Sequence, residues 1–158
     1  RRSGARVALR SIQHADIPAD VDILIGDTMG ELQRLYAASD ISFVGGSLAQ
    51  VGGHNLLESC AVGVPVVFGP NMFHFEEISV MALERGAGRQ VQDEDELAET
   101  VAFYLQQGEL RDAAGQAGRA LVAENRGAVN RTLQLIGDSP RWAELKQGKS
   151  SIISAIHD

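Results

Sequence analysis

The sequence of 158 residues has little of several residue types that mark whole classes of protein. It contains one cysteine, which cannot form an internal disulfide, so the fold does not depend on an oxidising compartment. Lysine and arginine total 14 against 21 acidic residues, and the net charge of −7 argues against nucleic acid as the main partner. The chain is acidic overall, although residues 1–10 hold four arginines and no acidic residue.

Long apolar runs are also lacking. Residues 41–57, an uncharged stretch that no other exceeds in length, contain four glycines together with Gln50, His54 and Asn55, which a lipid-exposed helix would not carry. We therefore expect a soluble chain without a membrane-spanning helix. The four histidines are scattered along the sequence without the spacing of a metal-ligand motif, so no metal site is predicted.

Glycine, in contrast, is abundant. The sequence has 17 glycines, whereas an average composition of about 7% glycine would give about 11. Eight of them fall within residues 26–69. This cluster directs attention to the turns of that segment, because glycine permits backbone conformations and close approaches that other residues do not.

Short apolar runs alternate with helical patterns along the chain, which is typical of βα units on a parallel sheet. The strands are expected at residues 7–12, 21–25, 40–44, 65–68 and 87–91. The helices are expected at about residues 28–39, 54–62, 75–85, 93–107, 110–124 and 128–136. The sequence thus predicts an α/β domain, a Rossmann-like parallel sheet with helices on both faces, over residues 1–136. A C-terminal helix and tail are expected over residues 137–158.

The most informative segment is GGSLAQVGGHNLLE, residues 45–58, which follows a buried strand and leads into a helix. Open α/β sheets bind ligands at the carboxyl ends of their strands, and a helix N-terminus offers backbone N–H groups to an anion. Ser47, His54 and Asn55 add side-chain donors, and Glu58 lies one turn along the helix from Asn55. The pattern favours the phosphate site of a nucleotide. A turn that merely needs positive φ is the alternative interpretation.

Two further segments follow neighbouring strands. In GDTMGEL, residues 26–32, the Met-Gly-Glu portion is placed to border the same ligand, and a helix cap formed by Thr28 and Glu31 is the alternative. In GPNMFHFEEI, residues 69–78, Asn71 and His74 are polar groups at the expected sheet end. Because the carboxyl ends of parallel strands meet at one edge of a sheet, we expect these loops to converge on one crevice.

The segments DTMGEL, AASDISFVGGSLAQVGGHNLLE and GVPVVFGPNMFHFEEI closely resemble the carboxyl-terminal half of 3-deoxy-D-manno-octulosonic acid (Kdo) transferases. The resemblance covers residues 21–136. It implies the GT-B glycosyltransferase fold and transfer of Kdo, with inversion, from CMP-Kdo to the lipid A precursor in lipopolysaccharide assembly. It places the parent enzyme at the cytoplasmic face of the bacterial inner membrane. No cofactor is implied besides the donor substrate.

Carried over to this sequence, the resemblance implies donor contacts along two loops. Asn55 and the amides of Gly52 and Gly53 meet the CMP phosphate, Glu58 meets the ribose, and residues 29–31 border the cytosine. The residues implied to bind CMP-Kdo or CMP are Met29, Gly30, Glu31, Gly46, Ser47, Gly52, Gly53, His54, Asn55 and Glu58.

The sequence departs from the family pattern in two respects. The family's N-terminal domain, which holds the acceptor site and the catalytic carboxylate, has no counterpart here. The first βα unit of the second half, with its Pro-Arg-His motif, has none either. No catalytic residue is therefore assigned, and we expect no Kdo transfer by this polypeptide alone. A small change is Cys60, which stands where alanine is usual and is expected to be buried.

Two other functions fit the same residues. One is a sugar-nucleotide epimerase or a transferase that uses a UDP-sugar, since these enzymes share the two-domain architecture. The other is a non-catalytic module that binds a nucleotide or a protein partner. Preference for UDP over CMP distinguishes the first, and a crevice closed by side chains distinguishes the second.

Overall fold

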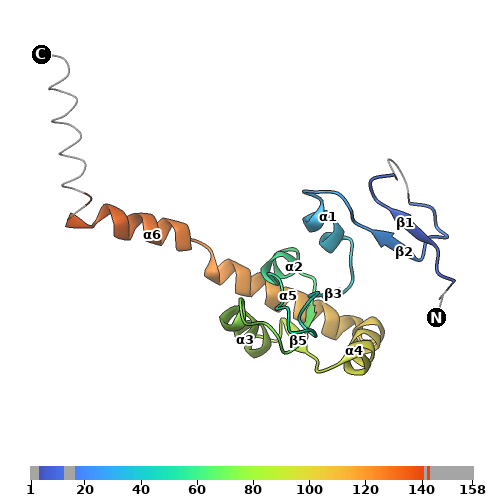
Figure 1. Ribbon diagram of the computed structural model, residues 1–158. Coiled ribbons are helices and arrows are strands. Elements are labelled where there is room, and N and C mark those ends of the chain that lie inside the picture. Colours follow the sequence, from blue (N-terminus) through green and yellow to red (C-terminus); the bar gives the residue numbers. More distant parts are fainter. Residues whose placement is uncertain (1–3, 13–16, 141, 143–158) are drawn as a thin grey trace, which may run out of the picture. The chain divides into compact units, whose positions relative to one another are not determined.

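The computed structural model describes residues 4–12, 17–140 and 142. In these residues, short strands alternate with helices along most of the chain (Figure 1). The elements in chain order are β1 (Val7–Leu9), β2 (Ile23–Ile25), α1 (Leu32–Ala37), β3 (Ser42–Phe43), α2 (Leu57–Val62), β4 (Val66–Phe68), α3 (Glu76–Glu84), β5 (Gly88–Gln90), α4 (Glu94–Gln106), α5 (Gly108–Asn125) and α6 (Ala128–Gly137). The expected α/β class is confirmed.

The strands lie in two parallel sheets. β1 pairs with β2, and β3, β4 and β5 form a three-stranded sheet in that order. In the second sheet Ser42 is in register with Val66, and Val66 with Gly88. All the pairings are parallel, as the alternation of strands and helices predicts. The division into two sheets was not expected, because the sequence patterns indicate strands but not which strands are neighbours.

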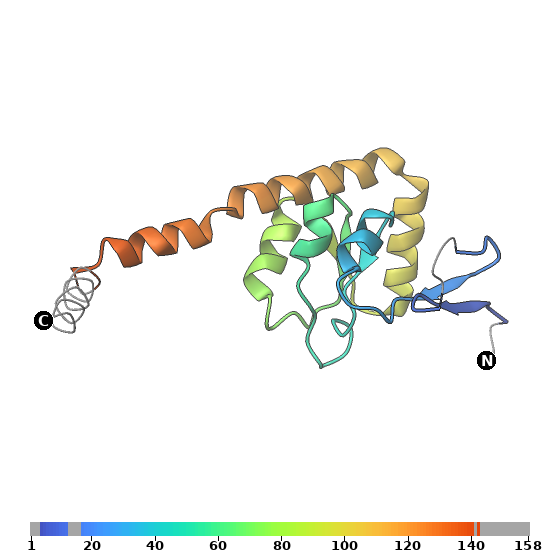
Figure 2. The ribbon, with the colours of Figure 1, turned by 90° about the horizontal axis from the view of Figure 1, so that it is seen from above.

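The core fills both faces of the three-stranded sheet. Successive side chains of a strand point to opposite faces, so Val66 and Phe68 lie on one face and Val67 on the other. On the first face they pack with residues of α2, α3 and α5, which include Cys60, Ala82 and Leu121. On the second face the partners are Val91, Tyr104 and Ala114, the last two from α4 and α5. Helices therefore cover both faces, as expected (Figure 2).

Close packing of α5 against α2 depends on two glycines. A Cβ atom on Gly115 would lie 2.1 Å from the carbonyl oxygen of Gly63, and one on Gly118 would lie 3.2 Å from the Cα of Cys60. Cys60 is fully buried at this contact, which confirms the expectation, and burial raises the pKa of its thiol to about 11. The C-terminal end of α2 is completed by the guanidinium of Arg119, which donates to the carbonyl oxygen of Val62 at 2.8 Å.

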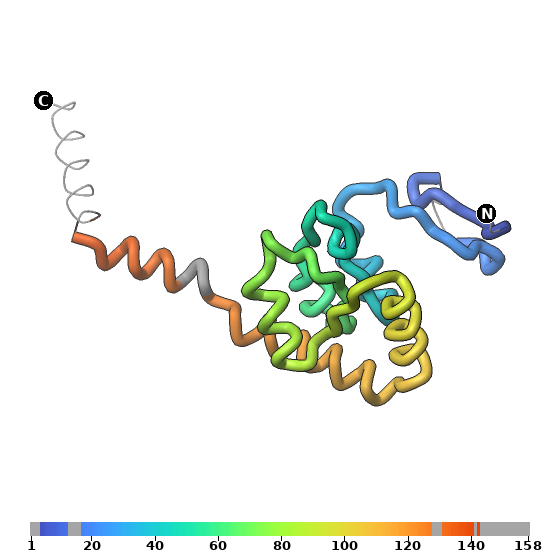
Figure 3. Tube along the Cα trace, turned by 60° about the horizontal axis from the view of Figure 1, so that its bottom comes forward, coloured from blue at the N-terminus to red at the C-terminus, as the bar shows by residue number. Residues whose placement is uncertain are grey.

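The four helices from α3 to α6 begin and end within two residues of the expected positions. Asp93 shows why the start of α4 could be predicted from the sequence. Its carboxylate accepts hydrogen bonds from the backbone N–H groups of Asp95 and Glu96, which makes it the N-cap of α4. α4 and α5 are separated only by Gln107, and Figure 3 traces the chain through both.

The two earlier helices begin later than expected. α1 was predicted from residue 28 but begins at Leu32, because Gly30 has φ +81°, which no helical residue adopts. Instead of capping the helix, the hydroxyl of Thr28 donates to the carboxylate of Glu31 at 2.5 Å. α2 was predicted from residue 54 but begins at Leu57.

The chain divides into two compact units, residues 1–122 and 123–158. Both sheets lie in the first unit, and α6 lies in the second. The predicted boundary between residues 136 and 137 stays a prediction, because most of residues 137–158 lie outside the described residues. Among those described, no helix is long and apolar enough to cross a membrane.

Candidate functional site

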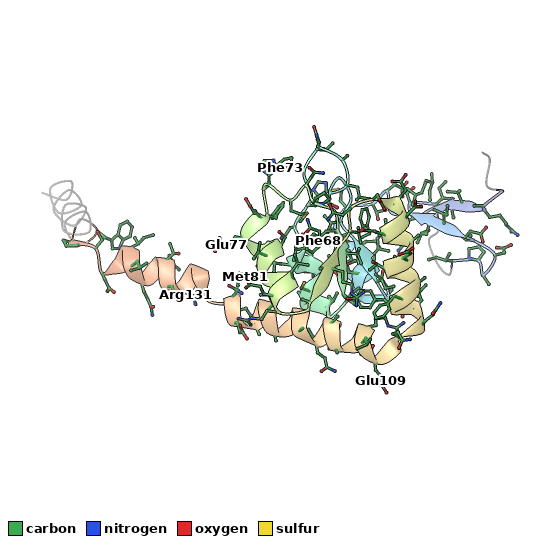
Figure 4. All side chains as sticks on the ribbon, turned by 90° about the horizontal axis from the view of Figure 1, so that it is seen from below. Phe68, Phe73, Glu77, Met81, Glu109 and Arg131 are labelled. Atoms are coloured by element: carbon green, nitrogen blue, oxygen red, sulfur yellow. The ribbon has the colours of Figure 1, made fainter. Side chains whose placement is uncertain are left out.

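Two loops lie together at the carboxyl end of the three-stranded sheet. We call them the β3 loop, residues 44–56, and the β4 loop, residues 69–75. Figure 2 shows both loops projecting from the same end of the sheet. Figure 4 shows Phe73 of the β4 loop at this end, whereas Phe68 of β4 lies among the packed elements. Two of the loops expected to converge are therefore adjacent.

Ser47 joins the two loops. Its side chain is fully buried, and its hydroxyl donates to the carbonyl oxygen of Val44 at 2.5 Å and accepts from the N–H of Gly69 at 2.7 Å. Its carbonyl oxygen accepts both from the backbone N–H of Asn71, at 2.9 Å, and from the side-chain amide of Asn71, at 3.1 Å. Ser47 therefore holds the β3 loop against the β4 loop through hydrogen bonds made within the protein.

Glycine is required where the two loops touch. A Cβ atom on Gly69 would lie 2.4 Å from the carbonyl oxygen of Ser47, which is backbone and has little room to move. Gly52 has φ +90°, and a Cβ there would lie 2.7 Å from the ring of Phe73. The glycine excess in the sequence thus serves close backbone contact between loops as well as turning.

The backbone N–H of Gly53 also takes part in the contact between the two loops. Its N–H donates to the carbonyl oxygen of Asn71 at 2.8 Å. The resemblance assigned this amide to a phosphate, but in this structure it already has an acceptor. Gly46, with φ +79°, packs so closely that a Cβ would lie 2.6 Å from the carbonyl oxygen of Gly52.

The residues directly after the glycine pair are open. His54 and Asn55 are exposed, and among the described residues no acceptor is found for the backbone N–H of His54, Asn55 or Leu56. The side-chain oxygen of Asn55 accepts from the N–H of Leu57 at 3.0 Å, which begins α2. The side-chain NH2 group of Asn55 has no hydrogen-bond partner among the described residues. The end of the β3 loop therefore presents N–H donors, the chemistry that an anion needs.

Glu58 lies in the first turn of α2, partly buried. It is close enough to Tyr36 of α1 that burial and the Glu58 carboxylate together raise the pKa of the Tyr36 hydroxyl. Glu58 thus lies on the side of α2 that faces α1, one turn along from the exposed Asn55.

The segment after β2, residues 26–31, is held by a different set of contacts. The Glu31 carboxylate pairs with the guanidinium of Arg10 at 2.9 Å, and the Asp27 carboxylate accepts from the hydroxyl and the N–H of Ser11. Hydrogen bonds, from Thr28 to Glu31 and from Ser11 to Asp27, lower the pKa of both carboxyls. Met29 is 98% exposed. No hydrogen bond or ion pair of the described residues joins this segment to the β3 or β4 loop.

A pocket of about 260 Å³ lies between the β4 loop, α3 and the end of β5. Phe68 and Met72 contribute apolar surface, and Glu76 and Gln90 contribute polar groups. None of the residues predicted to bind the donor lines this pocket. The predicted site is instead the open surface at the end of the β3 loop.

The sequence did not reveal the roles of three residues that organise this region. Asn71 was recognised as polar but not as the clamp between loops, because its partner is a backbone carbonyl distant in sequence. Tyr36 lies near enough to Glu58 for that carboxylate to raise the pKa of its hydroxyl, and Arg10 pairs with Glu31, in each case across separate elements. No signal in the sequence places those pairs together. Within the described residues there is no cluster of three metal-ligating side chains, and the absence of a metal stays a prediction.

Comparison with known proteins adds independent information. The family model for group 1 glycosyl transferases matches residues 5–121. The 3-deoxy-D-manno-octulosonic acid transferase of Bordetella pertussis is 38% identical over 136 residues, which are 86% of this chain and 32% of that protein. The enzyme of the same name from Haemophilus influenzae is 42% identical over 118 residues, which are 74% of this chain and 28% of that protein. The chain thus spans about a third or less of the length of these relatives.

A solved structure is also similar. It is the C-terminal CMP-Kdo binding domain of WaaA from Acinetobacter baumannii, with a TM-score of 0.70 and 31% sequence identity. The match covers 75% of this chain and 62% of that domain.

Proposed function

We propose that this chain, which belongs to the group 1 glycosyl transferases, binds the sugar donor. The proposed donor is CMP-Kdo, and the whole enzyme would transfer Kdo, with inversion, to the lipid A precursor. The observation that carries the proposal is the pair of loops joined at Ser47, with the exposed residues His54 and Asn55 at their end and no acceptor for their N–H groups among the described residues. Relatives named for Kdo transfer and a neighbour named for CMP-Kdo binding support it.

Each part of the proposed donor, the phosphate and the ribose, is assigned to particular groups of the chain. The phosphate meets the backbone N–H groups of His54 and Asn55 and the side-chain amide of Asn55, because these exposed donors have no partner among the described residues. Gly46, Gly52 and Gly53 act by letting the backbone come close, and Ser47 acts by fixing the loop. Glu58 accepts from the ribose hydroxyls.

The base is assigned to the segment of residues 29–31. Met29 exposes nearly its whole side chain, which offers an apolar surface to a pyrimidine ring. Gly30, with φ +81°, leaves its backbone groups unobstructed, since a Cβ there would meet nothing within 4 Å. The Glu31 carboxylate holds the segment through Arg10.

The parent enzyme is proposed to act at the cytoplasmic face of the bacterial inner membrane, with the acceptor site and the catalytic carboxylate on an N-terminal domain. No cofactor and no nucleic acid enter the proposal. Residues 1–158 alone are expected not to transfer Kdo. Transfer detected by mass spectrometry after mixing this chain with CMP-Kdo and the lipid A precursor would contradict that expectation.

Binding of CMP tests the proposed donor site. We expect CMP, titrated into ¹⁵N-labelled chain, to shift the amide resonances of His54, Asn55 and Leu56 with a Kd of about 1 mM, or about −4 kcal/mol. UDP is the matched competitor. A preference for UDP would favour an epimerase or a UDP-sugar transferase, and shifts with neither nucleotide would favour a non-catalytic module.

Asn55→Asp isolates the phosphate contact. The aspartate keeps an oxygen to accept from the N–H of Leu57 but loses the amide donor and adds a negative charge. We expect CMP affinity to fall by at least about tenfold, which equals about 1.4 kcal/mol. Gln106→Glu, at the exposed end of α4, adds the same charge as a control and is expected to leave CMP affinity unchanged.

A further inference from the structure

His74 lies in the β4 loop, with its imidazole against the backbone of the β3 loop. A Cβ atom on Gly52 would lie 3.3 Å from Cδ2 of His74 and 2.7 Å from the ring of Phe73, so both rings border Gly52. The two rings meet edge to face, with centroids 5.1 Å apart and an angle of 69° between their planes. The imidazole of His74 is thereby held beside the chain two residues before His54, where the proposed phosphate surface begins.

The backbone that carries His74 is fixed, whereas its side chain is open. Asn71 joins the β4 loop to Ser47. The N–H of Phe75 donates to the carbonyl oxygen of Met72 at 2.7 Å, which closes a turn around His74. His74 is exposed, and no hydrogen bond or ion pair of the described residues involves its imidazole. A side chain with free ring nitrogens on a fixed loop is preorganised for a ligand.

The β3 and β4 loops contain only two side chains that can carry a positive charge. These loops hold no lysine, no arginine and no acidic residue, and their titratable side chains are His54 and His74. Histidine gains a proton, and with it a positive charge, within the range of pH 5 to 8. The nearest acidic residues along the chain are Glu58 in α2 and Glu76 and Glu77 in α3. Besides N–H groups, an anion at this surface therefore has two imidazoles to meet.

The proposed donor carries two negative groups next to each other. An octulosonic acid has its carboxylate on the same carbon that, in the CMP ester, bears the phosphate oxygen. A surface that binds the phosphate must therefore accept a second anion beside it, and two like charges held together are costly unless each has a partner. The exposed N–H donors of His54 and Asn55 are assigned to the phosphate. The carboxylate thus needs a partner from outside the β3 loop.

We infer that the imidazole of His74 binds the carboxylate of the donor sugar and so favours nucleotide sugars of the acidic, 2-ulosonate class. This role of His74 rests on the proposed function, because it assumes that the phosphate lies at residues 54 and 55. His74 reaches this place from the β4 loop, whereas the phosphate donors come from the β3 loop, so the two anions meet separate groups. A hydrogen bond between a charged imidazole and a carboxylate is of the strong, charge-assisted kind. His74 acts in donor binding, and no step of the transfer is assigned to it.

Substitution of His74 tests the contact with two ligands. CMP-Kdo, prepared immediately before use, carries the carboxylate, and the methyl ester of CMP carries the same singly charged phosphate diester without it. Affinities are measured from the amide shifts of His54 and Asn55 in the ¹⁵N-labelled chain. At about pH 6 we expect His74→Gln to weaken the binding of CMP-Kdo by at least about threefold, and that of the methyl ester by less than about twofold.

The pH dependence separates an effect of charge from one of structure. The carboxylate and the diester of CMP-Kdo keep their charges between about pH 6 and pH 8, so a change in affinity comes from the protein. We expect the advantage of the unsubstituted chain over His74→Gln to be largest at about pH 6 and to shrink toward pH 8, as the imidazole loses its proton. His74→Lys keeps a positive charge throughout and should retain the affinity for CMP-Kdo at both pH values. Unchanged amide shifts of Ser47 and Gly69 show that the loops stay joined in each variant.

His54→Gln makes the same change on the other loop, and we expect it to weaken both ligands to a similar degree. Loss of CMP-Kdo binding alone in His54→Gln, and not in His74→Gln, would assign the carboxylate to His54 and overturn the inference. Equal effects of His74→Gln on both ligands, or no effect on either, would overturn it and leave the proposed function standing. Binding of neither ligand to the unsubstituted chain would overturn both.

Discussion

At the scale of single residues, buried polar groups in the loops are fully used. Ser47 makes four hydrogen bonds through its hydroxyl and carbonyl oxygens, and each of them ends within the β3 or β4 loop. In the described residues, no buried side-chain nitrogen or oxygen lacks a partner. A buried hydroxyl without hydrogen-bond partners lowers stability. The hydroxyl of Ser47 has its partners within the protein, and these bonds fix the geometry of the loops.

Glu31 provides a pH-dependent contact at this scale. Its folded-state pKa lies below the ordinary value of 4.5, so folding favours the charged form. Its contribution to stability is complete above that value and is lost as the pH falls through the folded pKa. We expect Glu31→Gln to lower the midpoint of urea unfolding at pH 7. The difference from the unsubstituted chain should shrink as the pH falls below about 4.

Glu84→Gln is the control for Glu31→Gln, because Glu84 lies at the exposed end of α3 and its substitution removes the same charge. A gap between the two urea midpoints that stays constant from pH 7 to pH 3 would show that the Glu31 carboxylate contributes through shape and not through charge.

At the scale of elements, glycine decides how closely helices approach. We expect Gly115→Ala to destabilise the chain by about 1–3 kcal/mol, since the added methyl would lie 2.1 Å from the backbone oxygen of Gly63. Urea unfolding measures the change. Gly108→Ala is the matched control within α5, because a Cβ there meets nothing within 4 Å and alanine favours helix. Equal stabilities of the two variants would contradict the close α2–α5 contact.

The sequence predicted elements well where the determining signals are local. Asp93 and Gly86 mark the start of α4 and the end of α3, because a cap depends on neighbours a few residues away. α2 was predicted three residues too long at its start, since the N–H of Gly53 donates to the carbonyl oxygen of Asn71 in another loop. Contacts between elements of this kind have no signature in one sequence. For the same reason the residues of the β3 loop could be selected, but their hydrogen-bond partners could not.

At the scale of the whole molecule, stability is concentrated around the three-stranded sheet. Phe68 lies on the central strand of this sheet and is 1% exposed, so we expect Phe68→Ala to lower the free energy of unfolding by about 3–5 kcal/mol. That is a large part of the 5–15 kcal/mol that holds a typical domain folded, at about 25 °C. Calorimetry or urea unfolding should detect it easily.

Phe73→Ala is the control for Phe68→Ala, because this ring is 53% exposed in the β4 loop, and a cost below about 1 kcal/mol is expected. A larger loss from Phe73→Ala than from Phe68→Ala would place the main core in the loops. The resemblance to Kdo transferases noted in the sequence is confirmed by the relatives and by the solved domain, whereas the assigned donor contacts stay predictions.

The contacts of Ser47 and Asn71 have a consequence for the thermodynamics of recognition. Because the loops are cross-connected in the free protein, their conformational entropy is lost during folding and not when a ligand arrives. Association then bears a smaller ordering penalty, and more of the interaction energy appears as affinity. For a surface organised in this way, we expect binding of the proposed donor to be a near rigid-body encounter, with backbone shifts of about 1 Å or less.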